Sequence, residues 1–197
     1  MNNFIYEKLA VTNLKNNRKT YVPYIFTGVL TVMMFYIIDA LSRGKGITQD
    51  TLKICLQYAT GVIVVFAVIF LFYTNSFLIK RRKKEIGVYN ILGMGKRHIA
   101  RMMAVETILT AGISILGGLV FGIIFGKLMY LLLLKILRNS VDMQFSVNGT
   151  AIIQTVILFA GIFLLTYLYN ILQIQLVNPV ELLHGGNQGE KEPKSRW

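Results

Sequence analysis

Apolar residues in this 197-residue chain form long continuous runs, separated by short polar and basic segments. They do not alternate with polar residues, as they would in half-buried strands. A helix crosses a membrane with about 20 apolar residues, and it satisfies its backbone hydrogen bonds internally, as lipid requires. The pattern therefore predicts an all-α integral membrane protein with four transmembrane helices, at about 21–41, 54–79, 102–134 and 149–177.

The third run is longer than one membrane crossing requires. The helix from Arg101 to Lys127 would be about 39 Å long, which exceeds a hydrocarbon core of about 30 Å. We therefore expect Lys127 at the outer membrane boundary, with the rest of the run tilted, bent, lying on the surface or packed against something above it. Three glycines recur every fourth residue and so share one helix face, which favours close helix packing: Gly118, Gly122 and Gly126. The alternative is that glycine is simply frequent in membrane helices.

Composition and charge agree with a membrane protein and predict its orientation. The chain is 54% hydrophobic and 15% charged, against about 25% charged residues in soluble domains. Its net charge of +12 would suggest nucleic acid in a soluble protein. Here fifteen of the 21 Lys and Arg residues lie in the N-terminal segment, the loop between the second and third runs, and the C-terminal tail. Because cytoplasmic segments are rich in Lys and Arg, both termini and this loop are predicted to be cytoplasmic, with no nucleic-acid partner.

Residues 1–20 are predicted to form an amphipathic helix on the inner membrane surface. One half of its helical wheel carries the charged side chains, and the other half carries Ile5, Tyr6, Leu9, Ala10 and Leu14. Such a helix buries its apolar face at the lipid interface and turns its lysines toward anionic headgroups. The alternative is a basic leader that only sets the topology. Residues 178–197 are predicted to be a cytoplasmic tail or a linker.

Three charged residues fall inside or beside the spans, where charges are functional candidates. Asp39 ends the first span, and we expect it at the outer interface within reach of water. Glu106 lies one turn into the third span, and we expect it to pair with Arg101 or with a base of the N-terminal helix; the alternative is that it extends toward the inner interface. Together with Lys127, these residues form no continuous polar pathway, which argues against an ion channel or a proton-coupled carrier.

The sequence offers no site for catalysis, cofactor or metal. The segment 93–97 contains Gly and Lys but lacks the spacing and the hydroxyl of a phosphate-binding loop, so ATP hydrolysis would require another subunit. His98 and His184 have no Cys or His at metal-ligand spacing. Cys55 is the single cysteine, so an intrachain disulfide is impossible.

The loop between the second and third runs begins with five consecutive cations, residues 80–84. On their own these indicate a cytoplasmic loop with affinity for anionic lipid headgroups. The positions that follow have the spacing of a short helix: Glu85, Ile86, Tyr89 and Leu92. The glycines of Gly93-Met94-Gly95 should end that helix before the third span. A short helix that is partly basic and partly apolar suits docking on a partner protein.

This loop resembles the signature of FtsX-like (MacB-type) permease domains: basic residues, Glu85-Ile86-Gly87, then Gly93 followed by Lys96-Arg97. Weaker resemblances lie at residues 9–19 and 178–183. The resemblance implies that the loop is the coupling helix between spans two and three, which contacts the ATPase of an ABC transporter. The residues assigned to that contact are Lys83, Lys84, Glu85, Ile86, Gly87, Tyr89, Leu92, Gly93 and Met94.

The variant of the motif most resembles the N-terminal module of BceB-like permeases, which act in resistance to antimicrobial peptides and in their sensing. That branch implies a bacterial cell membrane, an ABC ATPase homodimer, membrane lipid, a second permease half and a sensor histidine kinase as partners. BceB-like permeases are much longer, with two such modules and a large extracellular domain. We therefore expect this chain to be a fragment or the product of a split gene.

The resemblance leaves two alternatives to a transport permease. One is a non-transport membrane regulator, in which the same coupling controls a cell-wall enzyme or a sensor kinase. The other is a four-helix membrane protein whose loop matches by chance.

Overall fold

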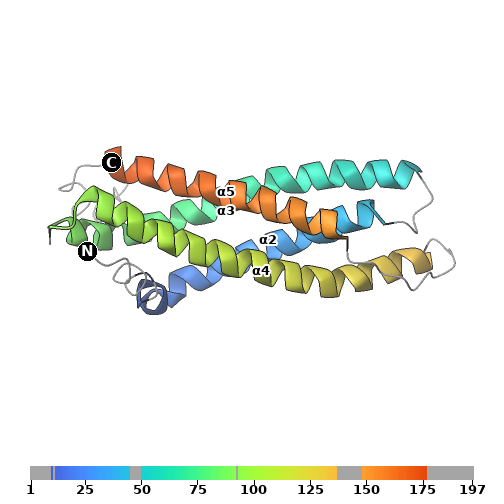
Figure 1. Ribbon diagram of the computed structural model, residues 1–197, viewed down its shortest axis with the longest axis horizontal. Coiled ribbons are helices and arrows are strands. Elements are labelled where there is room, and N and C mark those ends of the chain that lie inside the picture. The colour runs from blue at the N-terminus through green and yellow to red at the C-terminus, as the bar shows by residue number, and fades with distance from the viewer. Residues whose placement is uncertain (1–9, 11, 45–49, 92, 137–147, 177–197) are drawn as a thin grey trace, which may run out of the picture.

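The computed structural model describes residues 10, 12–44, 50–91, 93–136 and 148–176. It contains four long helices that lie lengthwise beside one another (Figure 1): α2 (Arg18–Ser42), α3 (Asp50–Ile91), α4 (Lys96–Ile136) and α5 (Gly149–Leu176). Residues 12–16 form a further helical segment before α2. All four long helices are long and apolar enough to cross a membrane, and no strand occurs among the described residues. The prediction of an all-α, multi-pass membrane fold is confirmed.

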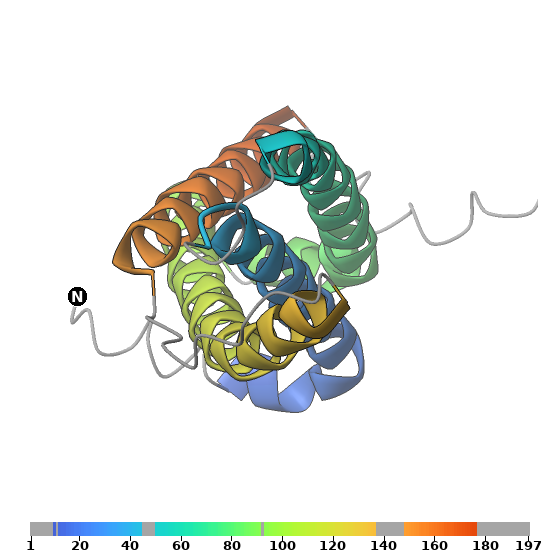
Figure 2. The ribbon, with the colours of Figure 1, turned by 90° about the vertical axis from the view of Figure 1, so that its right-hand side faces the viewer.

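Helix α2 contacts all three other helices and reaches the middle of the bundle toward the far end (Figure 2), while one of its faces, which includes Val22, Phe26 and Met34, is exposed. Its buried side chains therefore point in several directions, and they include Val32 and Tyr36. Aromatic contacts join α2 to α5, with Phe35 edge-on to Phe159 and Tyr24 edge-on to Phe163. The outer surface of the bundle carries large exposed apolar side chains, as expected where lipid is the solvent.

Glycines bring α2 and α4 close together. A Cβ atom on Gly118 would lie 2.5 Å from the side chain of Val32, and one on Gly122 would lie 2.8 Å from Tyr36. At Gly126 the same atom would make an ordinary contact, 3.8 Å from Tyr36. Sequence analysis missed the matching glycine on α2, Gly28, where a Cβ atom would lie 2.6 Å from Ser114 Oγ.

Helices α3 and α4 have 42 and 41 residues, so each is about 60 Å long, twice the thickness of a hydrocarbon core. The predicted separate coupling helix is instead the last part of α3, because the basic run consists of good helix formers. The helix ends at Ile91, and Gly93 follows with a φ of 88°, which glycine adopts readily. The Met94 amide donates to the Tyr89 carbonyl at 3.0 Å, which is the longer of the two hydrogen bonds of a Schellman C-cap.

We call the end of the bundle that carries this α3–α4 turn the turn end, and the other the far end; the turn end is on the left of Figure 1. At the far end the apolar run after Lys127 continues as regular helix. Its Tyr130 and Leu134 pack against Ile37 and Leu41 of α2, while Lys127 itself is exposed.

Candidate functional site

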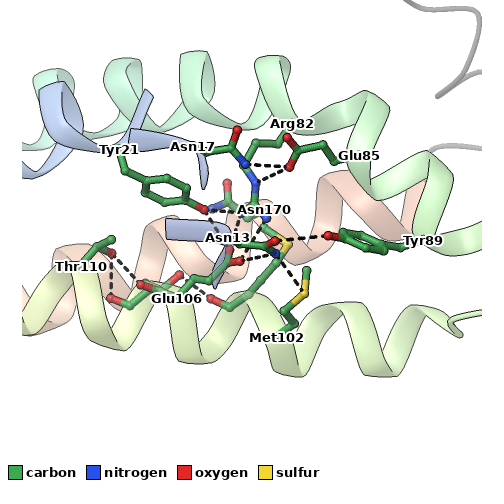
Figure 3. Close-up of polar contacts among 12 residues, drawn as sticks. Asn13, Asn17, Tyr21, Arg82, Glu85, Tyr89, Met102, Glu106, Thr110 and Asn170 are labelled. Atoms are coloured by element: carbon green, nitrogen blue, oxygen red, sulfur yellow. Dashed lines mark hydrogen bonds and ion pairs between the residues drawn. The ribbon is translucent and has the colours of Figure 1, made fainter. Parts of the chain in front are cut away.

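A cluster of polar side chains at the turn end joins three segments of the chain (Figure 3). The segments are the N-terminal residues 12–21, the last third of α3, and the first turns of α4. We call this cluster the Arg82 network; its members are Asn13, Asn17, Tyr21, Arg82, Glu85, Tyr89, Met102 and Glu106. The network is set in the main apolar core, against Ile79, Ile86 and Ile99.

The centre of the network is a buried ion pair between Arg82 of α3 and Glu106 of α4. Arg82 is 2% exposed and Glu106 is 3% exposed. The guanidinium donates through Nη1 to Oε2 of Glu106 and through Nη2 to Oε1 at 3.0 Å, the two-pronged geometry that suits Arg and carboxylate. Two further donors reach the same carboxylate, the Tyr21 hydroxyl at 3.0 Å and the Asn13 amide at 3.2 Å. The carboxylate thus has the several donors that a charge in a low-dielectric interior requires, whereas Arg82 Nε has no hydrogen-bond partner and lies 3.5 Å from Oε2 of Glu85.

Pairing of Glu106 was predicted, but the predicted partner was wrong. The carboxylate binds Arg82 rather than Arg101 or a base of the N-terminal segment, and Arg101 is exposed. The N-terminal segment does reach Glu106, through the neutral groups of Asn13 and Tyr21. Sequence analysis missed Arg82 because it stands within a run of five cations. Its spacing from two isoleucines, three residues after Ile79 and four before Ile86, is a helical signal for a shared buried face.

Several residues assigned to ATPase contact also contact other parts of the bundle, although the Glu85 side chain is still 38% exposed. Glu85 accepts a hydrogen bond from Asn17 at 3.1 Å and lies 3.5 Å from Arg82. The Tyr89 hydroxyl donates to Asn13 at 3.2 Å. Ile86 is 1% exposed and Gly87 is also buried. In this conformation these side chains hold α3 against the N-terminal segment.

The exposed surface of the turn end differs from the set of residues that the sequence analysis named. Val88, Gly93, Gly95 and Arg97 are exposed, and Met94 is half-buried against the core. Leu92 and the side chains of Lys83 and Lys84 lie outside the described part of the chain. Contact of this surface with an ATPase stays a prediction.

A second buried polar contact joins α3 to α5 deeper in the bundle. The side-chain amides of Asn75 and Asn170 bond to each other in both directions, at 2.7 and 3.0 Å, and both residues are buried. Asparagines that pair across membrane helices stabilise their packing by hydrogen bonds. Asn75 is about 10 Å along the helix from Arg82, so α3 is fixed to α4 and to α5 at successive levels.

Comparison with known proteins identifies the family. The family model described as FtsX-like permease C-terminal matches residues 59–179. The chain belongs to the FtsX-like permease family. The matched range covers most of α3, the turn, α4 and α5, so the Arg82–Glu106 pair lies within it. Asn13, Asn17 and Tyr21 lie before it.

Curated relatives of this FtsX-like chain are bacterial permeases. The bacitracin export permease protein BceB of Bacillus subtilis (strain 168) is 31% identical over 83% of this chain and 26% of its own length. The BceB protein of Halalkalibacterium halodurans is 31% identical, over 94% of this chain and 29% of its own length. An uncharacterized ABC transporter permease of Bacillus subtilis, YvcS, is 27% identical over 95% of this chain and 29% of its own length. The chain thus spans less than a third of each of these relatives.

The far end of the chain is built differently. Asp39 was expected within reach of water, but it is 4% exposed and forms an ion pair with Arg43 at 3.1 Å. Arg43 also donates to the side-chain oxygen of Gln154 on α5. These three residues line a cavity of about 310 Å³ between α2, α3 and α5. Among the described residues no group of His, Cys, Asp or Glu could hold a metal ion, and Cys55 is exposed.

Proposed function

We propose that this chain is part of an ABC transporter permease and that it carries motion from a separate ATPase subunit across the membrane. Its membership of the FtsX-like permease family and its permease relatives support this role. Two of those relatives are named as bacitracin export permeases. We therefore propose antimicrobial-peptide export, with the associated resistance or sensing, as the process that it serves.

The orientation that this role needs agrees with the charge distribution. We place the turn end and both termini in the cytoplasm of a bacterial cell, because fifteen of the 21 Lys and Arg residues lie in the segments assigned to that side. The exposed cations Arg81, Lys96 and Arg97 then surround the α3–α4 turn on the side where an ATPase is located. A homodimeric ATPase, a second permease half and a sensor histidine kinase belong to the same proposal as partners.

The observation that carries this mechanism is the connection between the turn and the spans. Helix α3 runs without a break from Asp50 to Ile91, so its last turns are mechanically continuous with the membrane span. The Arg82–Glu106 pair then fixes α3 to α4 just inside the turn. Because the pair is buried and costly to separate, a displacement of the turn by the ATPase would move α3 and α4 together.

The residues that contact the ATPase differ from the residues that hold the contact surface in position. We assign the ATPase contact to the exposed Val88 and the glycines of the turn, together with the lysines before them. Glu85, Ile86 and Tyr89 are positioning residues: Glu85 and Tyr89 bond to the N-terminal segment and Ile86 is buried in the core, which together hold the contact surface in place.

An exposed apolar residue on each end of α3 gives a direct test of the contact surface. Val88 is 47% exposed near the turn and Ile54 is 51% exposed near the start of the helix. We expect Val88→Asp to reduce sharply the ATPase recovered when the tagged chain is purified from native membranes in mild detergent, and Ile54→Asp to leave recovery unchanged. Equal recovery with both variants would contradict the docking surface.

A growth assay tests the process rather than the contact. Deletion of the gene should lower the bacitracin concentration that stops growth, and the wild-type chain should restore it while Val88→Asp should not. If the deletion strain is as sensitive to bacitracin as the wild type, the assignment to peptide export is rejected. Intact ATPase association in the same experiments would still support the assignment to an ABC transporter.

A further inference from the structure

The cavity at the far end is an open hollow on the side of the bundle, lined by α2, α3 and α5. Its volume of about 310 Å³ is at the lower end of the range for small-molecule pockets, about 300–1,000 Å³. Its polar lining includes Asp39, Ser42, Arg43, Gln57 and Gln154. Phe35 and Val64 contribute apolar surface to the same cavity.

The level of this cavity in the bundle is that of a lipid headgroup. Asp39 lies about 27 Å along α2 from Tyr21 of the Arg82 network, close to the thickness of one hydrocarbon core. The two polar regions therefore lie at opposite faces of the apolar layer, whichever face is cytoplasmic. Within the cavity, Phe35 is one helical turn nearer the membrane centre than Asp39, and Val64 is two turns nearer than Gln57. The lining thus changes from polar to apolar in the same direction as a phospholipid.

The charges of the cavity select the kind of headgroup. Arg43 Nε donates to both carboxylate oxygens of Asp39, at 3.2 and 3.1 Å, so the cavity carries one charge of each sign. A lone anion beside Arg43 is also repelled by the neighbouring Asp39 carboxylate, and a lone cation beside Asp39 is repelled by Arg43. A headgroup with both charges has a counterpart for each. The carboxylate and the side-chain amides of Gln57 and Gln154 also offer acceptors to an ammonium that carries N–H groups.

We propose that this cavity binds the headgroup of a zwitterionic phospholipid of the phosphatidylethanolamine type. Its phosphate lies on the guanidinium of Arg43, and its ammonium lies on the carboxylate of Asp39 and the neighbouring amide oxygens. The acyl chains leave along Phe35 and Val64 toward the bilayer. This site is independent of the proposed ATPase coupling, since it lies at the other end of the bundle.

Two glycines provide a matched pair of variants for the test. Gly61 lines the cavity, whereas Gly161 of α5 does not line it. A Cβ atom added at either position meets no atom within 4 Å, so leucine at either site avoids a clash with the backbone. Gly61→Leu should fill the cavity, and Gly161→Leu should only add apolar surface.

The measurement is native mass spectrometry of the purified chain in detergent, titrated with phosphatidylethanolamine, phosphatidylglycerol or phosphatidylcholine of identical acyl chains. We expect phosphatidylethanolamine to bind about tenfold more tightly than phosphatidylglycerol, a difference of about 1.4 kcal/mol. Phosphatidylcholine should also bind more weakly than phosphatidylethanolamine, because its ammonium has no N–H group. Gly61→Leu should remove this preference and Gly161→Leu should keep it.

Two results would overturn the proposal. Equal binding of the three lipids would show only the nonspecific lipid that surrounds any membrane helix. A preference unchanged by Gly61→Leu would place the lipid elsewhere. The thermal unfolding midpoint shows whether Gly61→Leu folds. If it does not, Arg43→Gln replaces it in the same binding measurement. Lys127→Gln is then the control, because Lys127 is an exposed cation that does not line this cavity.

Discussion

The two ends of the bundle use similar chemistry for opposite purposes. Both ends have an ion pair between an arginine and a buried carboxylate, Arg82 with Glu106 at the turn end and Arg43 with Asp39 at the far end. Both carboxylates are buried, but the Arg82 side chain is 2% exposed whereas the Arg43 side chain is 36% exposed. The turn-end pair joins two helices, and the far-end pair joins Asp39 of α2 to Arg43, four positions later at the end of the same helix.

The N-terminal segment accounts for much of this difference. Asn13 and Asn17 close the turn end by bonding to Glu106 and Glu85, and Leu14 packs against the core. The far end has a cavity between three helices. A closed polar network suits transmission of force between helices, and an open cavity suits binding. The difference implies that substitutions at the turn end should affect folding and those at the far end should affect ligand binding.

Removal of the buried arginine should have the largest effect. In Arg82→Met the carboxylate of Glu106 loses its charged partner inside the bundle, and such losses cost about 3–5 kcal/mol. We expect a large fall in the thermal unfolding midpoint of the purified chain in detergent. Arg81→Met is the control, because Arg81 is exposed and adjacent. The double variant Arg82→Met/Glu106→Leu should recover much of the loss; equal midpoints for the two single variants would contradict the buried pair.

A methyl group on the glycine face of α4 should have the next largest effect. Gly118→Ala would place its Cβ atom 2.5 Å from Val32, so α2 and α4 must move apart, at a cost of about 1–3 kcal/mol. Gly126→Ala has room and should change the unfolding midpoint little. Equal midpoints for the two variants would show that the helices repack freely along this face.

Sequence patterns predicted the features that depend on local order. The four spans follow from run length, the end of α3 from Gly93, and the family from the residues around Glu85-Ile86-Gly87. The glycine spacing predicted a shared face on α4, but it could not distinguish Gly118 from Gly126. That distinction depends on which α2 side chain lies opposite, and α2 is distant in the sequence.

Contacts between distant residues were not predictable in the same way. Asn75 and Asn170 stand in separate apolar runs, and only the packing of α3 on α5 brings their amides together. The far-end cavity likewise depends on three helices that meet near Asp39, Gln57 and Gln154. Basic residues were interpreted as a group, so the buried position of Arg82 among exposed cations was missed.

The asparagine pair should make a smaller contribution than either feature above. Asn75→Leu leaves the amide of Asn170 without its partner in a buried place, and interhelical hydrogen bonds in membranes contribute about 0.6 kcal/mol on average and about 1.7 at most. We expect a modest fall in the unfolding midpoint. Asn75→Leu/Asn170→Leu removes both polar groups and should recover stability; additive losses from the two changes would show that the amides do not interact.

The far-end pair should have the smallest effect on stability. In Arg43→Gln the buried Asp39 carboxylate loses its charged partner, but the side chain at position 43 is 36% exposed and the glutamine amide is still a donor for Asp39, so we expect a loss of about 1 kcal/mol or less. The thermal unfolding midpoint should stay near that of the wild type, while the preference for phosphatidylethanolamine should be lost. Arg43 would then be required for the lipid preference but not for the stability of the fold. A fall in the midpoint as large as that of Arg82→Met would instead mean that both ends are structural, and the contrast between them would fail.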